Sequence, residues 1–432
     1  MSKVSKLSDR SDADQAVARR PRRTQLAAPA KRPEIFAELA PDRLVADLRE
    51  MISIPSVNPF DAAPRLGFRE QEMAELYCDR MSDLGLEVGS TDVVPGRPNV
   101  WGVLKGRGEG PSLMLSGHLD TVGTENYAEP FLTRVEDGRV HGRGACDMKA
   151  ALAAYLEVVR LIRAADVSLA GDLIVTGLAD EEHQMIGSRH LGRHGPWADY
   201  GIIGEPTDMA VCPAHKGQVA FHIRTFGKAV HASMPEKGIN AIGSMSQVIE
   251  AFRAYGAELM TRKAHPLCGH ARTSPGVIRG GTIVSTVPDF CELEVDRRTL
   301  PGETGEDVLR EYRALLDRLA ASSSEFRYEI SGPTMDIAPL DIPIDTPVVR
   351  SVMRAYQEVM GDEVAASAFF GGTDAPNFGF PSLIFGPGSI AQAHSTNEFV
   401  RTDDLVSATE VYLWAALDLL APDCLTAFGG PA

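Results

Sequence analysis

Histidines and carboxylates gather at the ends of predicted strands in this chain. Four short apolar segments are each followed by such residues: His118 and Asp120 after 112–117, Glu181 and Glu182 after 172–179, Glu205 after 200–204, and His394 after 382–386. In an open α/β sheet, ligands bind outside the carboxyl ends of the strands. We therefore expect these side chains to lie close together at one edge of a sheet.

Such a cluster would combine several negative charges with two imidazoles. Like charges packed together repel one another unless a cation compensates them. Histidine, aspartate and glutamate suit a hard-to-borderline divalent metal, and zinc readily takes nitrogen and oxygen ligands. Asp147, just before a predicted helix, is a further carboxylate of this kind. The pattern thus predicts a metal site.

Each of these residues also has a simpler interpretation when it is taken alone. The alternatives are a helix cap at Asp147, a solvated loop pair at Glu181 and Glu182, a turn former at Asp120, and hydrogen-bonded structural histidines at His118 and His394. The joint placement of all of them after strands favours the metal site over these separate roles.

The elements that must position these residues follow an α/β rhythm. Short apolar runs alternate with amphipathic helices, which predicts an α/β fold with a mainly parallel sheet. The predicted strands are 99–106, 112–117, 172–179, 200–204 and 382–386, and the predicted helices are 42–54, 70–85, 148–165, 346–360 and 403–420.

The stretch 217–331 has a different rhythm. Its predicted strands and helices follow the order βαββαβ of a ferredoxin-like unit. We therefore expect a second domain, of the α+β class, to be inserted into the first. The predicted divisions are a disordered polar tail over 1–35, catalytic segments 36–213 and 333–432, and an inserted domain over 214–332.

Composition excludes several classes of protein. The net charge of −16 over 432 residues argues against non-specific nucleic-acid binding, which needs a basic surface. No run approaches the ~18 apolar residues of a membrane span. The N-terminal segment lacks the apolar core of a secretory signal. Six scattered cysteines form no CxxC pair, which indicates reduced thiols and a cytoplasmic protein.

Six motifs that occur in order carry a family resemblance. They are SGHLDTV (116–122), GRGACDMKAAL (142–152), ADEEHQMIGS (179–188), IIGEPT (202–207), HKGQVAFHIRTFGKAVHASMPEKGINAI (215–242) and FGPGSIAQAH (385–394). The chain resembles the co-catalytic zinc amidohydrolases and peptidases that include acetylornithine deacetylase, succinyl-diaminopimelate desuccinylase and aminoacylase. The resemblance covers roughly residues 40–420, and the motifs look most like those of acetylornithine deacetylases.

The resemblance implies a zinc-peptidase-like catalytic domain with an inserted lid or dimerisation domain, and it implies a role for each matching residue. Asp147 would bridge two metals, with Glu181 as the general base and Asp120 as the carboxylate that orients His118. The other ligands would be His118 and Glu205 for the first metal, and Glu182 and His394 for the second. In the inserted domain, His231 would act in the partner subunit's site, and Asn240 and Arg298 would bind a substrate carboxylate. Thr373 and Asp374 are candidates for lining the substrate pocket.

These roles imply hydrolysis of the amide bond of an N-acyl amino acid, with Glu181 deprotonating the attacking water. Two divalent ions are expected, with zinc first and cobalt or manganese as alternatives. The expected substrate is a small N-acyl amino acid or a dipeptide, and the expected assembly is a homodimer through the inserted domain. Two alternatives stay open, namely a dipeptidase or carboxypeptidase on the same scaffold and a non-catalytic metal-binding homologue.

Overall fold

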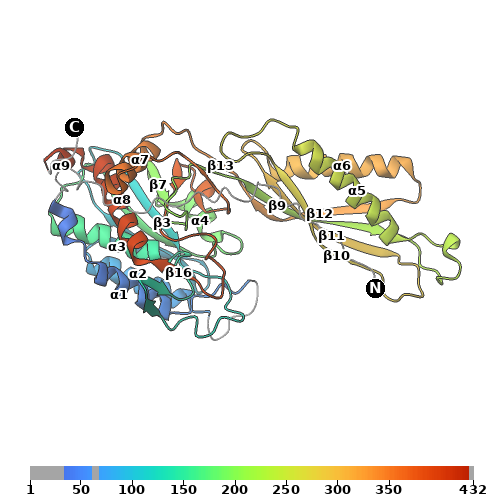
Figure 1. The fold of residues 1–432 in the computed structure, drawn as a ribbon, viewed down its shortest axis with the longest axis horizontal. Helices are drawn as coiled ribbons and strands as arrows, with labels where there is room; N and C mark the ends of the chain where they lie inside the picture. The colour runs from blue at the N-terminus through green and yellow to red at the C-terminus, as the bar shows by residue number, and fades with distance from the viewer. Residues whose placement is uncertain (1–33, 61–67, 428–432) are drawn as a thin grey trace, which may run out of the picture.

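The computed structural model describes residues 34–60 and 68–427, and it consists of two bodies joined side by side (Figure 1). The larger body contains a six-stranded sheet with helices around it, and the elongated body contains a four-stranded sheet. The tail expected over 1–35 lies outside the described residues up to residue 33. Ile35 is already buried, in a short 3-10 helix over Glu34–Glu38.

The six-stranded sheet has the strand order β1-β2-β6-β3-β7-β15. Strands β6, β3, β7 and β15 are parallel, whereas β2 pairs antiparallel with both β6 and the edge strand β1. The α/β class is therefore confirmed, but the sheet is mixed. The strand bounds are β1 Glu87–Val94, β2 Arg97–Leu104, β3 Leu113–His118, β6 Leu173–Leu178, β7 Tyr200–Ile203 and β15 Ser382–Ile384.

Strand β1 was not predicted from the sequence. Its residues are exposed or half-buried along its whole length, so it has no apolar run. It forms because β2 pairs with it across a tight turn, where Gly96 adopts a φ of 77° that favours glycine.

Apolar helices fill the space around the sheet. Helix α3 (Lys149–Ala164) is buried over most of its length and packs against β3, α8 (Thr402–Leu420) and α1 (Pro41–Ser53). Both α3 and α8 are buried on nearly every side, and most of their buried residues are apolar, as expected of helices enclosed by other elements. The outer helices are α2 (Glu70–Asp83), α4 (Ile186–His194), α7 (Pro347–Met360) and α9 (Pro422–Ala427).

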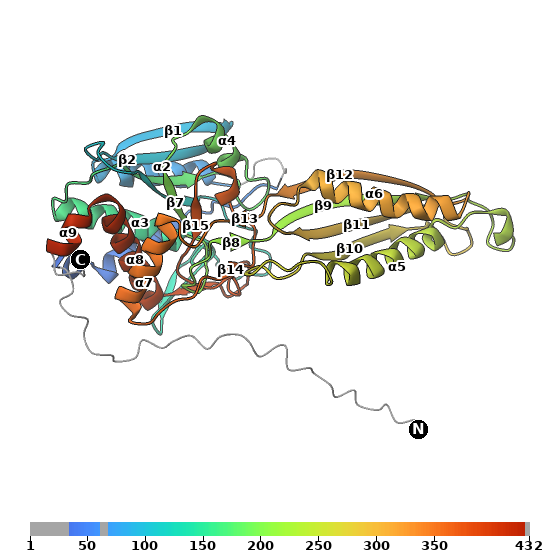
Figure 2. The ribbon, with the colours of Figure 1, turned by 90° about the horizontal axis from the view of Figure 1, so that it is seen from above.

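The elongated body is built only from residues between 217 and 337. Its elements follow the order β9–α5–β10–β11–α6–β12, and its antiparallel sheet has the strand order β10-β11-β9-β12. Alternate residues of β9 and β11 are buried, because both helices cover one face of the sheet (Figure 2). The bounds are β9 Gly217–Phe226, α5 Ala241–Leu259, β10 Arg272–Gly280, β11 Phe290–Thr299, α6 Gly305–Ser322 and β12 Arg327–Ile337.

Residues from both sides of this segment fold together in the larger body. Strand β15 pairs with β7, and the short strand β16 (Phe399–Arg401) pairs with β5 (Arg139–His141), which in turn pairs with β4 (Arg134–Glu136). A second small sheet contains β13 (Leu340–Asp341), β8 (Ala214–His215) and β14 (Ala368–Phe369). Over residues 34–60 and 68–427, no helix is both long and apolar enough to cross a bilayer.

Candidate metal centre

The predicted metal residues converge at the carboxyl edge of the parallel strands. His118 is the last residue of β3, and Glu205 follows β7 by two residues. Glu182 lies in the turn after β6, Asp147 precedes α3, and His394 lies in the loop between β15 and β16. Five residues that are distant in the sequence are therefore neighbours in space.

Asp147 lies between the two histidines. Its Oδ1 is 3.1 Å from Nε2 of His118, and its Oδ2 is 3.3 Å from Nε2 of His394. Each histidine has a glutamate beside it: Oε1 of Glu205 is 3.8 Å from His118 Nε2, and Oε2 of Glu182 is 3.1 Å from His394 Nε2. The cluster thus has two halves that share one carboxylate.

Glu181 joins the first half. Its carboxylate lies with the ligand atoms of His118 and Glu205, and these atoms all lie within 4.8 Å of one another. Residues 181–184 form a turn, which brings both glutamates to the cluster.

The simple alternative for Asp147, a helix cap, is also wrong. Met148 occupies the N-cap position of α3, and no side chain caps this helix. The carboxylate of Asp147 contacts the two histidines instead.

The cluster carries more negative charge than its protein neighbours can compensate. Burial, together with nearby carboxylates, raises the pKa of Glu181 and Glu205 well above the usual value. Oε1 of Glu205 is buried and has no hydrogen-bond partner among the described residues. A divalent cation would satisfy that oxygen and relieve the repulsion, so the residues present fit a metal pair.

The role of Asp120 differs in detail from the expected one. Nδ1 of His118 lies 2.9 Å from the backbone carbonyl of Asp120, while the carboxylate is 3.5 Å away. That carboxylate accepts hydrogen bonds from the backbone N–H groups of Glu181 (3.1 Å) and Glu182 (3.2 Å) and from Nδ2 of Asn58 (2.7 Å). Asp120 therefore positions the acidic turn as well as His118.

A buried network behind this turn was missed by the sequence analysis. Arg97 donates hydrogen bonds to Asp180 (2.6 Å) and to Glu70, and Asn58 also donates to Asp180 (3.0 Å). Asp180 has a φ of 68° and accepts from the backbone N–H of Gln184 (3.0 Å). These contacts hold the turn in its shape. These contacts join residues that are 27, 83 and 122 positions apart in the sequence, so no local pattern marked them.

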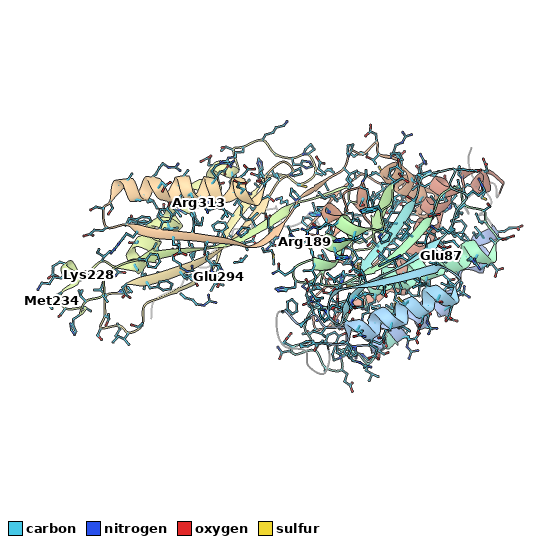
Figure 3. The ribbon with its side chains drawn as sticks, turned by 180° about the vertical axis from the view of Figure 1, so that it is seen from behind. Glu87, Arg189, Lys228, Met234, Glu294 and Arg313 are labelled. Atoms are coloured by element: carbon cyan, nitrogen blue, oxygen red, sulfur yellow. The ribbon has the colours of Figure 1, made fainter. Side chains whose placement is uncertain are left out.

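His231 is not near this cluster within one chain. It is exposed in the elongated body, where its Nδ1 lies 2.8 Å from Oγ of Ser233. The flanking residues Lys228 and Met234 lie at the tip remote from the larger body (Figure 3).

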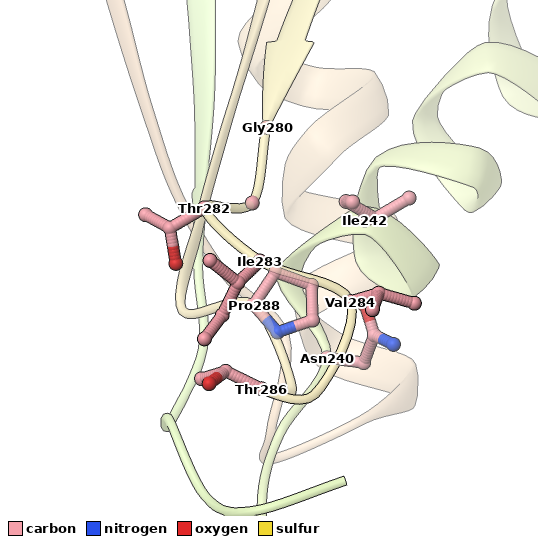
Figure 4. A pocket seen from close by; sticks show the side chains of 9 residues that line it. Asn240, Ile242, Gly280, Thr282, Ile283, Val284, Thr286 and Pro288 are labelled. Carbon is pink, nitrogen blue, oxygen red and sulfur yellow. The ribbon is translucent and has the colours of Figure 1, made fainter.

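The structure does not bring Asn240 and Arg298 together. Oδ1 of Asn240 accepts a hydrogen bond from Gly243 N (3.0 Å) and so caps α5. Arg298 donates to Asp296 (2.9 Å) and lies opposite Gln218 at the start of β9. Asn240 lines a pocket of about 420 Å³ in the elongated body (Figure 4), together with Ile242, Gly280, Gly281, Thr282, Ile283, Val284, Thr286 and Pro288.

The distance between Asn240 and Arg298 can be estimated along strand β11. Gly280, in the pocket, pairs with Cys291, which is seven residues before Arg298 on β11. Seven residues of extended strand span ~23 Å. Asn240, which lines the same pocket as Gly280, is therefore too far from Arg298 for both side chains to bind one carboxylate within a single chain.

The loop with Thr373 and Asp374 is buried near the cluster. Thr373 Oγ1 lies 3.1 Å from Nε2 of His215, whose pKa burial lowers to about 4. Asp374 is 2% exposed, and burial raises its pKa to about 7.

Comparison with known proteins identifies the family. A family model described as peptidase family M20/M25/M40 matches residues 114–418, a span that includes all the cluster residues. The chain belongs to this family. The resemblance inferred from the six motifs is thereby confirmed, and so is the expectation of an enzyme that hydrolyses amides.

M20/M25/M40 relatives are similar over most of the chain. An acetylornithine deacetylase of Edwardsiella ictaluri is 32% identical over 372 residues, covering 84% of this chain and 94% of the relative. An N-formyl-4-amino-5-aminomethyl-2-methylpyrimidine deformylase of Bacillus subtilis is 30% identical over 367 residues, covering 77% and 85%.

Solved structures share the fold at lower identity. The aminopeptidase PepT of Bacillus cereus superposes with a TM-score of 0.73 at 21% identity and covers 88% of this chain and 99% of that one. Human carnosine dipeptidase 1 has a TM-score of 0.68 at 18% identity, covering 89% and 98%.

Proposed function

We propose that this M20/M25/M40 enzyme removes the acyl group from an N-acyl amino acid by metal-dependent hydrolysis. The observation that carries the proposal is the position of Asp147, which presents one oxygen to each half of a divided histidine–glutamate cluster. The deacetylase and deformylase relatives, which cover most of the chain, favour an acyl substrate over a peptide.

Two divalent ions fit the cluster, and zinc is the first candidate, with cobalt or manganese as alternatives. His118 and Glu205 would hold one ion, His394 and Glu182 the other, and Asp147 both. When bound, such ions would polarise the scissile carbonyl and lower the pKa of a bound water.

The chain's own residues would then move the proton and hold the substrate. Glu181, beside His118 and Glu205, would take the proton of the attacking water and pass it to the leaving amine. His231 of a second subunit would donate to the developing oxyanion. Arg298 would pair with the α-carboxylate through its planar guanidinium. Asn240 would donate its amide to a substrate carboxylate in the partner's site.

A panel of substrates tests the proposed function. The enzyme, loaded separately with Zn²⁺, Co²⁺ and Mn²⁺, is assayed with N-acetyl, N-formyl and N-succinyl amino acids and with dipeptides of the same residues. The proposal expects the highest kcat/KM on an N-acyl amino acid. Preference for dipeptides would favour a peptidase, as PepT and carnosine dipeptidase 1 are named. No hydrolysis with any metal would favour a non-catalytic homologue, although Glu181 and all five ligands are present.

Metal binding is expected to release protons near neutral pH. Burial and the nearby Asp147 raise the pKa of Glu182 to about 7, and hydrogen bonds to Asp147 and Glu182 raise that of His394 to about 10. Both groups ligate a metal only when deprotonated, so protons compete more strongly as the pH falls. Zinc affinity should therefore decrease from about pH 8 to about pH 6. Calorimetric titration at about pH 8 and at about pH 6 measures the change in zinc affinity, and repeating it in two buffers of different ionisation heat measures the released protons. A pH-independent affinity would contradict the expectation.

We propose further that the chain is a homodimer through the elongated body, with His231 acting across the interface. Strand β10 is a sheet edge whose residues are mostly exposed, so its backbone groups are available to a symmetric partner. His231 is remote from the cluster of its own chain, as Figure 3 indicates for its neighbours. If His231 acts in the site of the partner subunit, it does not need to reach the cluster of its own chain.

Mixing two inactive variants tests action across the interface. His231→Ala and Glu181→Gln proteins are combined under conditions that exchange subunits. Half the dimers are then mixed and each has one intact site, so about a quarter of wild-type activity per subunit should return. Either variant exchanged with itself is the control. No recovery despite proven heterodimers would reject this role of His231.

A cytoplasmic location is also proposed. It is supported by the six cysteines, all of which are free thiols in the structure.

A further inference from the structure

A buried carboxylate outside the metal cluster is bonded to the loop that carries Asp147. Glu398 is 0% exposed, and its Oε1 accepts hydrogen bonds from the backbone N–H groups of Cys146 (2.9 Å) and Asp147 (3.1 Å). Its Oε2 accepts from the N–H of Gly144 (3.1 Å) and from the guanidinium of Arg143 (2.5 Å). Four donors from one short loop thus converge on one side chain.

The topology explains how Glu398 reaches this loop. It directly precedes β16, which pairs antiparallel with β5, and its carbonyl accepts a hydrogen bond from Gly142 N (3.2 Å). The strand pairing therefore continues into the loop before α3. Glu398 also follows His394 by four residues, so one segment supplies both a candidate ligand and the contacts that hold another.

The far side of Asp147 is fixed by a second buried group. Lys149, the first residue of α3, donates hydrogen bonds from Nζ to the backbone carbonyls of Met51 and Ile54, each at 2.9 Å. The backbone of Asp147 is thus held from both directions. This matters because both of its carboxylate oxygens must face different histidines at the same time.

We propose that Glu398 is a positioning residue, whose buried carboxylate holds the backbone of residues 143–147 so that Asp147 presents one oxygen to each half of the cluster. The inference rests on the proposed two-metal function. Residues that orient metal ligands from outside typically change metal affinity or activity 10–100-fold when they are replaced. Loss of Glu398 should mainly weaken metal binding and lower kcat, with little effect on KM. The reason is that no contact of its carboxylate involves the residues proposed to bind substrate.

The test compares Glu398→Asp and Glu398→Gln with a matched control, Glu157→Gln. Glu157 is also fully buried and bonded to arginines, Arg43 (2.8 Å) and Arg160 (2.7 Å), and it lies on α3 ten residues after Asp147. Metal affinity is measured by competition with a chelator, and coordination by the visible spectrum of the Co²⁺ protein. The Glu398 variants should bind metal ~10–100-fold more weakly, with an altered spectrum and a lower kcat at nearly unchanged KM. The control should retain native affinity and spectrum.

Native metal affinity and a native cobalt spectrum in a folded Glu398 variant would overturn the inference. Hydrogen exchange on the wild-type protein gives a test that does not depend on a variant folding. The amides of Gly144, Cys146 and Asp147 should be protected in metal-free protein as well as in loaded protein, and unprotected amides in the metal-free protein would also overturn it. If the wild type binds no metal pair, the proposed function fails as well. If the wild type binds the pair and the variants match it, only this inference fails.

Discussion

Replacing Glu181 with glutamine should reduce kcat by ~10²–10⁴-fold while leaving metal content near that of the wild type. Glutamine keeps the size of the side chain but cannot accept the proton of the attacking water. The backbone N–H of residue 181 still donates to Asp120, so the turn should keep its shape. Steady-state kinetics and elemental analysis of the same preparation measure the two quantities.

The neighbouring residue provides the control. Glu182→Ala removes the carboxylate that lies 3.1 Å from His394, so it should lower bound metal. If Glu181→Gln loses metal and Glu182→Ala keeps it, the roles of the two glutamates are exchanged in our account.

Removal of divalent metal should abolish hydrolysis. The cluster contains only histidines and carboxylates, and we propose none of them as a nucleophile that attacks the substrate directly. Glu181 therefore needs a water that a metal has activated for deprotonation. Dialysis against a chelator should reduce the rate to background, and Zn²⁺ or Co²⁺ should restore it. Restoration by Mg²⁺ alone would argue against the imidazole ligands, which suit softer ions. Full activity in a sample verified to be metal-free would reject a metal-dependent mechanism.

Much of the fold follows from the periodicity of the sequence. The apolar runs that end at His118 and Glu205 were recognisable as strands because β3 and β7 are nearly fully buried. The inserted βαββαβ order was readable for the complementary reason, since the alternating burial of β9 marks a sheet with one covered face. Strand β1 has neither pattern, and only its partner β2 defines it.

The candidate site was predictable only in part. Most of its candidate metal ligands follow the ends of strands, where a histidine or a carboxylate indicates a site. The family motifs supplied the assignment of each ligand to one of the two metals. The groups that hold them are different, because Asn58 bonds to residues 62 and 122 positions away, and Glu398 to one 251 positions away. Polar side chains with distant partners leave no local pattern. The turn at residues 181–184 was missed since it depends on the carboxylate of Asp120 and on the left-handed backbone of Asp180.

The most direct test of the metal centre is anomalous X-ray diffraction from crystals of the zinc-loaded enzyme. Our account predicts two anomalous peaks, one beside His118 and Glu205 and one beside His394 and Glu182, with a carboxylate oxygen of Asp147 facing each. A fully active enzyme whose crystals show no zinc between these side chains, or one ion that Asp147 does not contact, would contradict it.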